Sequence, residues 1–99
     1  MNMSIHRIGE FRANAEKVEE LRAFLQSIMP IILGSEGCEG CALFQSHEDA
    51  TKFVMTETWL DKEAHQASVK NIPQDMLRKI QPLLAMPPRG DYYDQVTSM

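Results

Sequence analysis

The segment from Gly37 to Ser68 constrains the fold of this 99-residue chain more than any other. It contains two strand-like stretches, about 41–47 and 52–59, which a polar turn separates. Asp61 follows the second stretch at a position typical of a helix N-cap. The segment therefore predicts a strand, a turn, a second strand and a helix, in that order.

The residues before this segment predict another strand and a long helix. Residues 5–12 alternate loosely between apolar and polar side chains and are expected to form a strand. From Ala15 onward, apolar residues recur at three- and four-residue steps, which is typical of an amphipathic helix: Val18, Leu21, Leu25, Ile28 and Ile32. Asn14 is expected to cap this helix, and Pro30 is expected to kink or end it.

The residues after the segment predict a broken helix and a last strand. The helix that begins after Asp61 should break near 71–73, and a further helix should run from about Pro73 to Pro87. Residues 90–96 are expected to form a strand. The order strand, helix, strand, strand, helix, strand predicts one α+β domain over 1–99, with a ferredoxin-like βαββαβ antiparallel sheet and its helices on one face.

Both faces of the predicted sheet carry apolar groups. Side chains alternate along a strand, so Cys41 and Leu43 point to one face while Ala42 and Phe44 point to the other. Helices on one side leave the second face bare, and a second copy of the same sheet is the simplest cover for it. We therefore expect a homodimer.

Composition and charge exclude several classes of partner. The net charge is −4 and the chain has no run of Lys and Arg, so neither nucleic acid nor an anionic membrane surface is an expected partner. No apolar run reaches membrane-spanning length. The first residues lack the apolar core of a signal peptide, which predicts a cytoplasmic protein.

A carboxylate interrupts the apolar face of the strand over 52–59. Phe53, Met55, Glu57 and Trp59 share that face. In one interpretation, apolar surroundings raise the pKa of Glu57, which then acts as a base or orients a substrate hydroxyl. In the other, Glu57 pairs with Arg7 or Arg12 on a neighbouring strand, which would lower its pKa.

His65 is the second candidate for proton transfer. On the predicted helix His65, Ser68, Val69 and Ile72 share a face that is expected to point inward. A neutral imidazole there could accept a proton near neutral pH. Alternatively, His65 is a partly exposed histidine that bonds to a backbone carbonyl or to water.

The two cysteines form a C-x-x-C motif, Cys38 to Cys41. A redox motif of this kind begins at a helix N-terminus, whereas this one leads into a strand. The motif supplies only two of the four ligands of a usual zinc site, so no metal is expected. The role of the two thiols stays open.

Several short motifs resemble the antibiotic biosynthesis monooxygenase family: Gly37-Cys38, Phe53-Val54, Glu57-x-Trp59 and Asp61-x-x-Ala64. The resemblance implies a small dimeric α+β barrel. Haem-cleaving members resemble one another in a strand-one Asn, a strand-three Trp and a helix His. Trp59 matches, but the first strand has no Asn, and Ser68 stands where many members have His. Haem is therefore not expected.

The resemblance implies a cofactor-independent monooxygenase that acts on an aromatic or quinol substrate. His65 and Glu57 are the expected catalytic residues. The expected substrate-binding residues are Trp59, Met55, Ser68 and Arg7, in a pocket between the sheet and the helices. Two alternatives remain: a non-catalytic dimeric module that binds a small ligand, and an isomerase of a small sugar or dicarbonyl.

Overall fold

The computed structural model describes residues 4–99. Its strands and helices are, in chain order, β1 (Ile5–Arg12), α1 (Val18–Leu33), β2 (Cys38–Gln45), β3 (Lys52–Trp59), α2 (Lys62–Ser68), α3 (Gln74–Ile80) and β4 (Arg89–Tyr93). Short 3₁₀ turns, Val69–Asn71 and Gln81–Leu83, follow α2 and α3. Within this part of the chain, no helix is long and apolar enough to cross a membrane.

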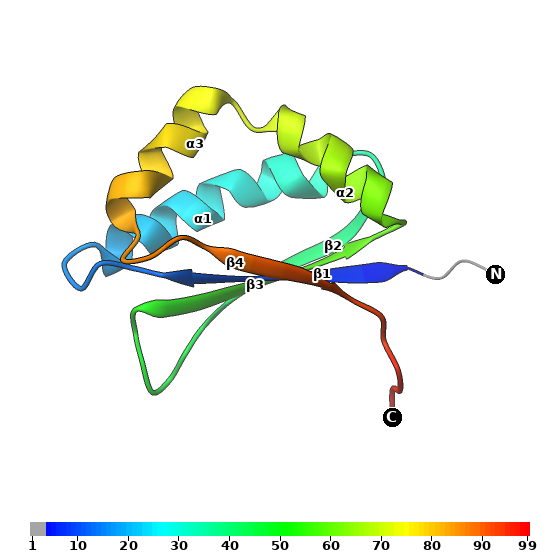
Figure 1. Cartoon of the computed structure of the whole chain (residues 1–99), viewed down its shortest axis with the longest axis horizontal. Helices are drawn as coiled ribbons and strands as arrows, with labels where there is room; N and C mark the ends of the chain where they lie inside the picture. The colour runs from blue at the N-terminus through cyan, green and yellow to red at the C-terminus, as the bar shows by residue number, and fades with distance from the viewer. Residues whose placement is uncertain (1–3) are drawn as a thin grey trace.

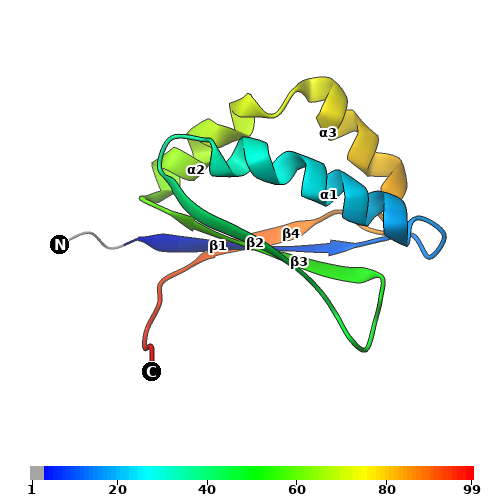
Figure 2. The same cartoon turned by 180° about the vertical axis from the view of Figure 1, so that it is seen from behind.

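The four strands form one antiparallel sheet in the order β2-β3-β1-β4, which confirms the predicted ferredoxin-like α+β fold. All three α-helices lie on the same side of this sheet (Figures 1 and 2). The opposite face carries no helix among the described residues, and the turn between β2 and β3 projects on that side.

Strand register brings four polar or reactive residues to the helix side of the sheet. Arg7 lies opposite Glu57 on β3 and opposite Tyr92 on β4. Cys41 on β2 lies opposite Glu57 from the other side. Residues that face each other across antiparallel strands point to the same face, and Glu57 shares its face with the buried Trp59.

The apolar stripe of α1 packs on the central strand β3 and forms the core. The largest fully buried side chains are those of Trp59, Phe53, Leu21, Leu25 and Met55. A buried aromatic or aliphatic side chain contributes roughly 1.5–3 kcal/mol to stability. The alternation predicted for 52–59 and the helical period predicted from Val18 are therefore what hold α1 on the sheet.

Both ends of α1 differ from the prediction. The helix begins at Val18, and Asn14 does not cap it because its side-chain amide donates instead to the Pro82 carbonyl, at 3.0 Å. Pro30 does not end the helix, which continues to Leu33. A proline removes one hydrogen bond, whereas burial of Ile32 against the core stabilises the last turn.

The second and fourth strands have different bounds from those predicted. β2 begins at Cys38 rather than Cys41, because a bulge between Cys38 and Gly40 extends its pairing with β3. β4 ends at Tyr93 rather than Val96, because its pairing with β1 stops where Tyr93 faces His6.

The start of α2 is fixed by contacts of two residues, Asp61 and Gly37. Asp61 caps the helix as predicted, and its carboxylate accepts the Ala64 backbone N–H at 2.8 Å. Gly37 has a φ of +87°, and a Cβ there would lie 2.7 Å from the Ala64 Cβ. The Gly37 carbonyl also accepts the Leu60 N–H at 2.8 Å. Gly37 therefore allows α2 to approach β2 closely.

The inward face predicted for α2 is correct at Ser68 and wrong at Val69. Ser68 is buried, whereas Val69 is 49% exposed. The α-helix ends at Ser68, and the tighter 3₁₀ turn that follows rotates the next side chain by a larger angle.

Candidate functional site

Three strands and one helix bring five side chains together on the helix side of the sheet. We call them the His65 cluster: Arg7 from β1, Glu57 and Trp59 from β3, His65 from α2 and Tyr92 from β4. Trp59 is fully buried, and the other four are partly exposed. The cluster therefore stands on the core and remains partly open to solvent.

Glu57 is bound from the same strand. Trp59 Nε1–H donates to Glu57 Oε1 at 2.7 Å. Burial raises the pKa of Glu57 above its ordinary value, and it outweighs the lowering effects of the Trp59 hydrogen bond and of the Arg7 charge. The interpretation as a partner of Arg12 is wrong, because Arg12 pairs with Asp49 at 3.0 Å.

Arg7 extends toward the edge strand β4. Its guanidinium carbon lies 4.9 Å from the centre of the Tyr92 ring, which is the geometry of a cation–π contact. A Cβ on Gly90 would come within 3.0 Å of three atoms of this guanidinium, so the glycine provides the space that Arg7 occupies. Lys62 Nζ lies 5.6 Å from the same ring centre. Two cations therefore flank Tyr92.

His65 bonds to Tyr92 and packs on Trp59. His65 Nδ1 and the Tyr92 hydroxyl are 2.6 Å apart. The His65 and Trp59 ring centres are 5.5 Å apart with an angle of 70° between the rings, an edge-to-face contact. Burial first and the Arg7 charge second lower the pKa of His65. The imidazole is therefore neutral at pH 7 and can accept a proton.

Two of the predicted substrate-binding residues lie elsewhere. Met55 is 1% exposed and belongs to the core. The Ser68 hydroxyl donates to the His65 backbone carbonyl at 2.6 Å, inside the last turn of α2. Their roles in binding remain predictions, whereas Arg7, Glu57, Trp59 and His65 are brought together.

Tyr92 is the member of the cluster that sequence reasoning assigned no role. The predicted strand over 90–96 contained it, and a ferredoxin-like sheet pairs the last strand with the first. With that pairing, the alternation of side chains would have placed Tyr92 on the face of Arg7. The sequence could therefore have placed Tyr92 beside Arg7 only after the order of the strands in the sheet was known.

The thiols and the described carboxylates do not form a metal centre. Within residues 4–99 no group of three or more His, Cys, Asp or Glu side chains could hold a metal ion. Burial raises the pKa of Cys41 to about 11 and also raises that of Cys38. Both thiols are thus protonated at pH 7 and are poor nucleophiles.

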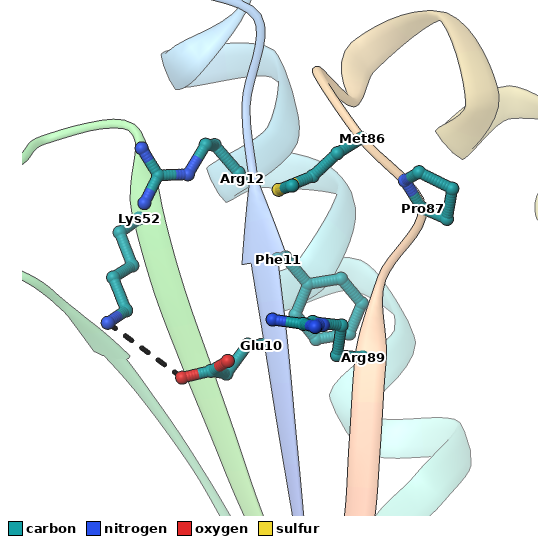
Figure 3. Close-up of a pocket in the computed structure, with 7 residues that line it drawn as sticks. All are labelled: Glu10, Phe11, Arg12, Lys52, Met86, Pro87 and Arg89. Carbon is teal, nitrogen blue, oxygen red and sulfur yellow. Dashed lines mark ion pairs between the residues drawn. The ribbon is translucent and has the colours of Figure 1, made fainter.

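A cavity that is partly open to solvent lies away from this cluster. It has a volume of about 370 Å³, and its lining includes Phe11, Lys52 and Met86 (Figure 3). None of its lining residues belongs to the His65 cluster. Phe11 is four residues from Arg7 along β1, which is about 13 Å in a strand.

Comparison with known proteins identifies the family. The family model described as antibiotic biosynthesis monooxygenase matches residues 4–77, a span that includes every cluster residue except Tyr92. No curated protein matches the chain.

Solved structures share the fold. A conserved protein from Methanosarcina mazei Go1 has a TM-score of 0.84 and 19% identity, over 95% of this chain and 94% of that one. PA3566 from Pseudomonas aeruginosa has a TM-score of 0.83 and 22% identity, over 98% of each chain. SnoaB, a cofactor-independent oxygenase from Streptomyces nogalater, has a TM-score of 0.83 and 10% identity, over 97% of this chain and 96% of that one. The family match covers most of the chain, and the protein belongs to the antibiotic biosynthesis monooxygenase family.

Proposed function

We propose that the protein is a cofactor-independent monooxygenase of an electron-rich phenol or quinol. The observation that carries the proposal is the hydrogen bond between His65 Nδ1 and the Tyr92 hydroxyl, beside Trp59. Family membership and the likeness of fold to an oxygenase that needs no cofactor support it. The phenol supplies the electrons, and the protein supplies a base and a binding surface.

His65 is the proposed base for the substrate hydroxyl. When Nδ1 carries the ring proton and donates it to Tyr92, the Nε2 lone pair is left to accept a proton. The lowered pKa of His65 keeps that lone pair available at pH 7. Tyr92 would act as a positioning residue, since its bond to Nδ1 holds the orientation of the ring.

The phenolate then reacts with oxygen at a ring carbon that carries hydrogen. One electron passes from the phenolate to O₂, and the two radicals join as a carbon-bound peroxide that takes a proton. The O–O bond breaks as the ring C–H proton leaves, which forms C=O and water. The net reaction converts the phenol and O₂ into a quinone and water, so O₂ supplies one oxygen atom to each product.

The remaining cluster residues would bind the substrate and its anion. The positive charge of Arg7 would stabilise the phenolate, which lowers the barrier when the charge develops. Glu57 is the second candidate acceptor, for the ring C–H proton. The edge of the Trp59 ring would form one wall of the site. Met55 would support the site from beneath, and Ser68 would support it from α2.

We further propose that two copies of the chain pair through the bare faces of their sheets. Phe44 is 55% exposed there, and Val54 lies opposite it in the register. Ala42 and Ile8 are partly exposed neighbours on the same face. Removal of this apolar strip from water would stabilise a dimer at about 25 cal/mol for each Å² buried.

Oxygen-isotope labelling tests the proposed reaction. The protein is incubated with a panel of hydroquinones under ¹⁸O₂, and the products are analysed by mass spectrometry. The proposal predicts one labelled oxygen atom in the quinone product and none when the label is supplied as H₂¹⁸O and exchange is corrected for. Binding of the hydroquinones without any oxygen uptake would favour the ligand-binding module instead.

A further inference from the structure

The 370 Å³ cavity has the chemistry of a second binding site. Its lining comes from the ends of β1, β3 and β4 and from the loop before β4 (Figure 3). The volume is within the range of small-molecule sites, about 300–1,000 Å³. It shares no residue with the His65 cluster. It adjoins the apolar strip of the proposed dimer on the same face of the sheet, because Glu10 lies opposite Val54.

Cationic side chains dominate the polar part of the lining. The lining includes three cations, Arg12, Lys52 and Arg89, and one carboxylate, that of Glu10. This balance is opposite in sign to the net charge of −4 of the whole chain. A local excess of cations in a negatively charged protein favours an anionic ligand at this place.

Arg89 is the cation that is most available to a ligand. Lys52 Nζ lies 3.8 Å from Glu10, and Arg12 pairs with Asp49 at 3.0 Å. Among residues 4–99, no carboxylate oxygen lies within 4.0 Å of the Arg89 guanidinium. The planar fork of an arginine matches the two oxygens of a carboxylate.

The other part of the lining is apolar. Phe11 presents an aromatic ring, Pro87 a rigid ring, and Met86 a flexible thioether that is 46% exposed. Methionine adapts its shape to flat ligands and makes favourable contacts with aromatic rings. An anion that also carries a flat apolar body would use both parts of the lining.

We propose that this cavity binds an aromatic monocarboxylate, with the carboxylate on Arg89 and Lys52 and the ring against Phe11 and Met86. The site is separate from the proposed reaction site. Its occupation does not require His65 or oxygen.

Titration with 2-naphthoate tests the site, with backbone amide NMR shifts as the readout. The proposal predicts saturable shifts at Arg89, Met86 and Phe11, and at least tenfold weaker binding of 2-naphthamide, which has the same shape without the charge. Arg89→Gln should weaken the binding of naphthoate at least tenfold, and Arg89→Lys should weaken it less. Arg78→Gln on α3, also an exposed arginine, is the matched control and should bind as wild type does.

Three outcomes would overturn the proposal. Equal affinity for naphthoate and naphthamide would show that the cations do not bind the ligand. Unchanged affinity in a folded Arg89→Gln variant would remove Arg89 from the site. Shifts that centre on His65 and Tyr92, or binding that His65→Ala abolishes, would place the ligand in the His65 cluster.

Discussion

Trp59 donates its indole N–H to Glu57, two residues earlier on the same strand, across 2.7 Å. The bond gives a partner to the one polar atom of a fully buried indole. It also gives a partner to the Glu57 carboxylate, whose charge is costly to bury. Both residues belong to the His65 cluster, and Trp59 also belongs to the core. A change at either residue therefore affects both stability and the site.

Glu57→Gln is expected to change how stability depends on pH. Glutamine can still accept the Trp59 bond but has no charge. Because burial raises the pKa of folded Glu57 above 4.5, the folded state binds this proton more tightly than the unfolded state does. The free energy of unfolding of the wild type should therefore fall, relative to that of the variant, as pH rises through the raised pKa.

Urea unfolding of both proteins between pH 4 and pH 7 measures this difference. Glu48→Gln, which removes an exposed carboxylate in the turn between β2 and β3, is the control and should show no comparable trend. A gap between wild type and Glu57→Gln that is constant over this pH range would show that Glu57 is not held in a proton-favouring environment.

Gly90→Ala is expected to displace Arg7. The new methyl group would meet the guanidinium, so Arg7 should leave Tyr92 and its charge should move away from His65. Arg7 lowers the pKa of His65, although less than burial does, so that pKa should rise toward 6.5. NMR titration of the imidazole ring protons gives the value.

Gly40→Ala is the matched control for Gly90→Ala. A Cβ at Gly40 meets no atom within 4 Å, and Gly40 is also in a strand. The pKa of His65 should be the same in this variant and in the wild type. A pKa that stays equally unchanged in Gly90→Ala would mean that Arg7 has no electrostatic effect on His65.

Trp59→Ala should cost about 3–5 kcal/mol of stability, because it leaves a cavity beneath α1 and α2 and removes the donor to Glu57. Trp59→Phe should cost less, since it keeps an aromatic ring. Leu60→Ala, at a neighbouring residue that is 42% exposed, is the control and should cost under about 1 kcal/mol. Equal urea midpoints for Trp59→Ala and Leu60→Ala would contradict the burial of the indole.

Local patterns predicted the core better than they predicted the site. The period of two over Lys52–Trp59 and the cap at Asp61 are properties of adjacent residues, and both are as predicted. Tyr92 reaches His65 only through the pairing of β4 with β1, which no local pattern contains. The helix does not end at Pro30, because packing of the last turn of α1, a tertiary effect, outweighs one lost hydrogen bond.

The proposed dimer predicts a sedimentation mass near twice 11.3 kDa at micromolar concentration. Phe44→Asp should give the monomer mass, because a charge in the apolar strip would be costly to bury. Leu33→Asp is the matched control: Leu33 is also 55% exposed but lies at the end of α1, on the other side of the sheet. A wild-type mass of one chain would contradict the dimer.

The most direct test of the account is oxygen uptake by His65→Ala with a hydroquinone that the wild type oxidises. General base catalysis contributes about 10²–10⁴-fold. The account predicts a loss of rate within that range, unchanged folding by circular dichroism, and partial recovery when imidazole is added. It also predicts that the wild-type rate rises with pH and that the apparent pKa of this rise is below 6.5, because burial lowers the pKa of His65. Oxygen uptake that persists at the wild-type rate in a folded His65→Ala variant would contradict the account.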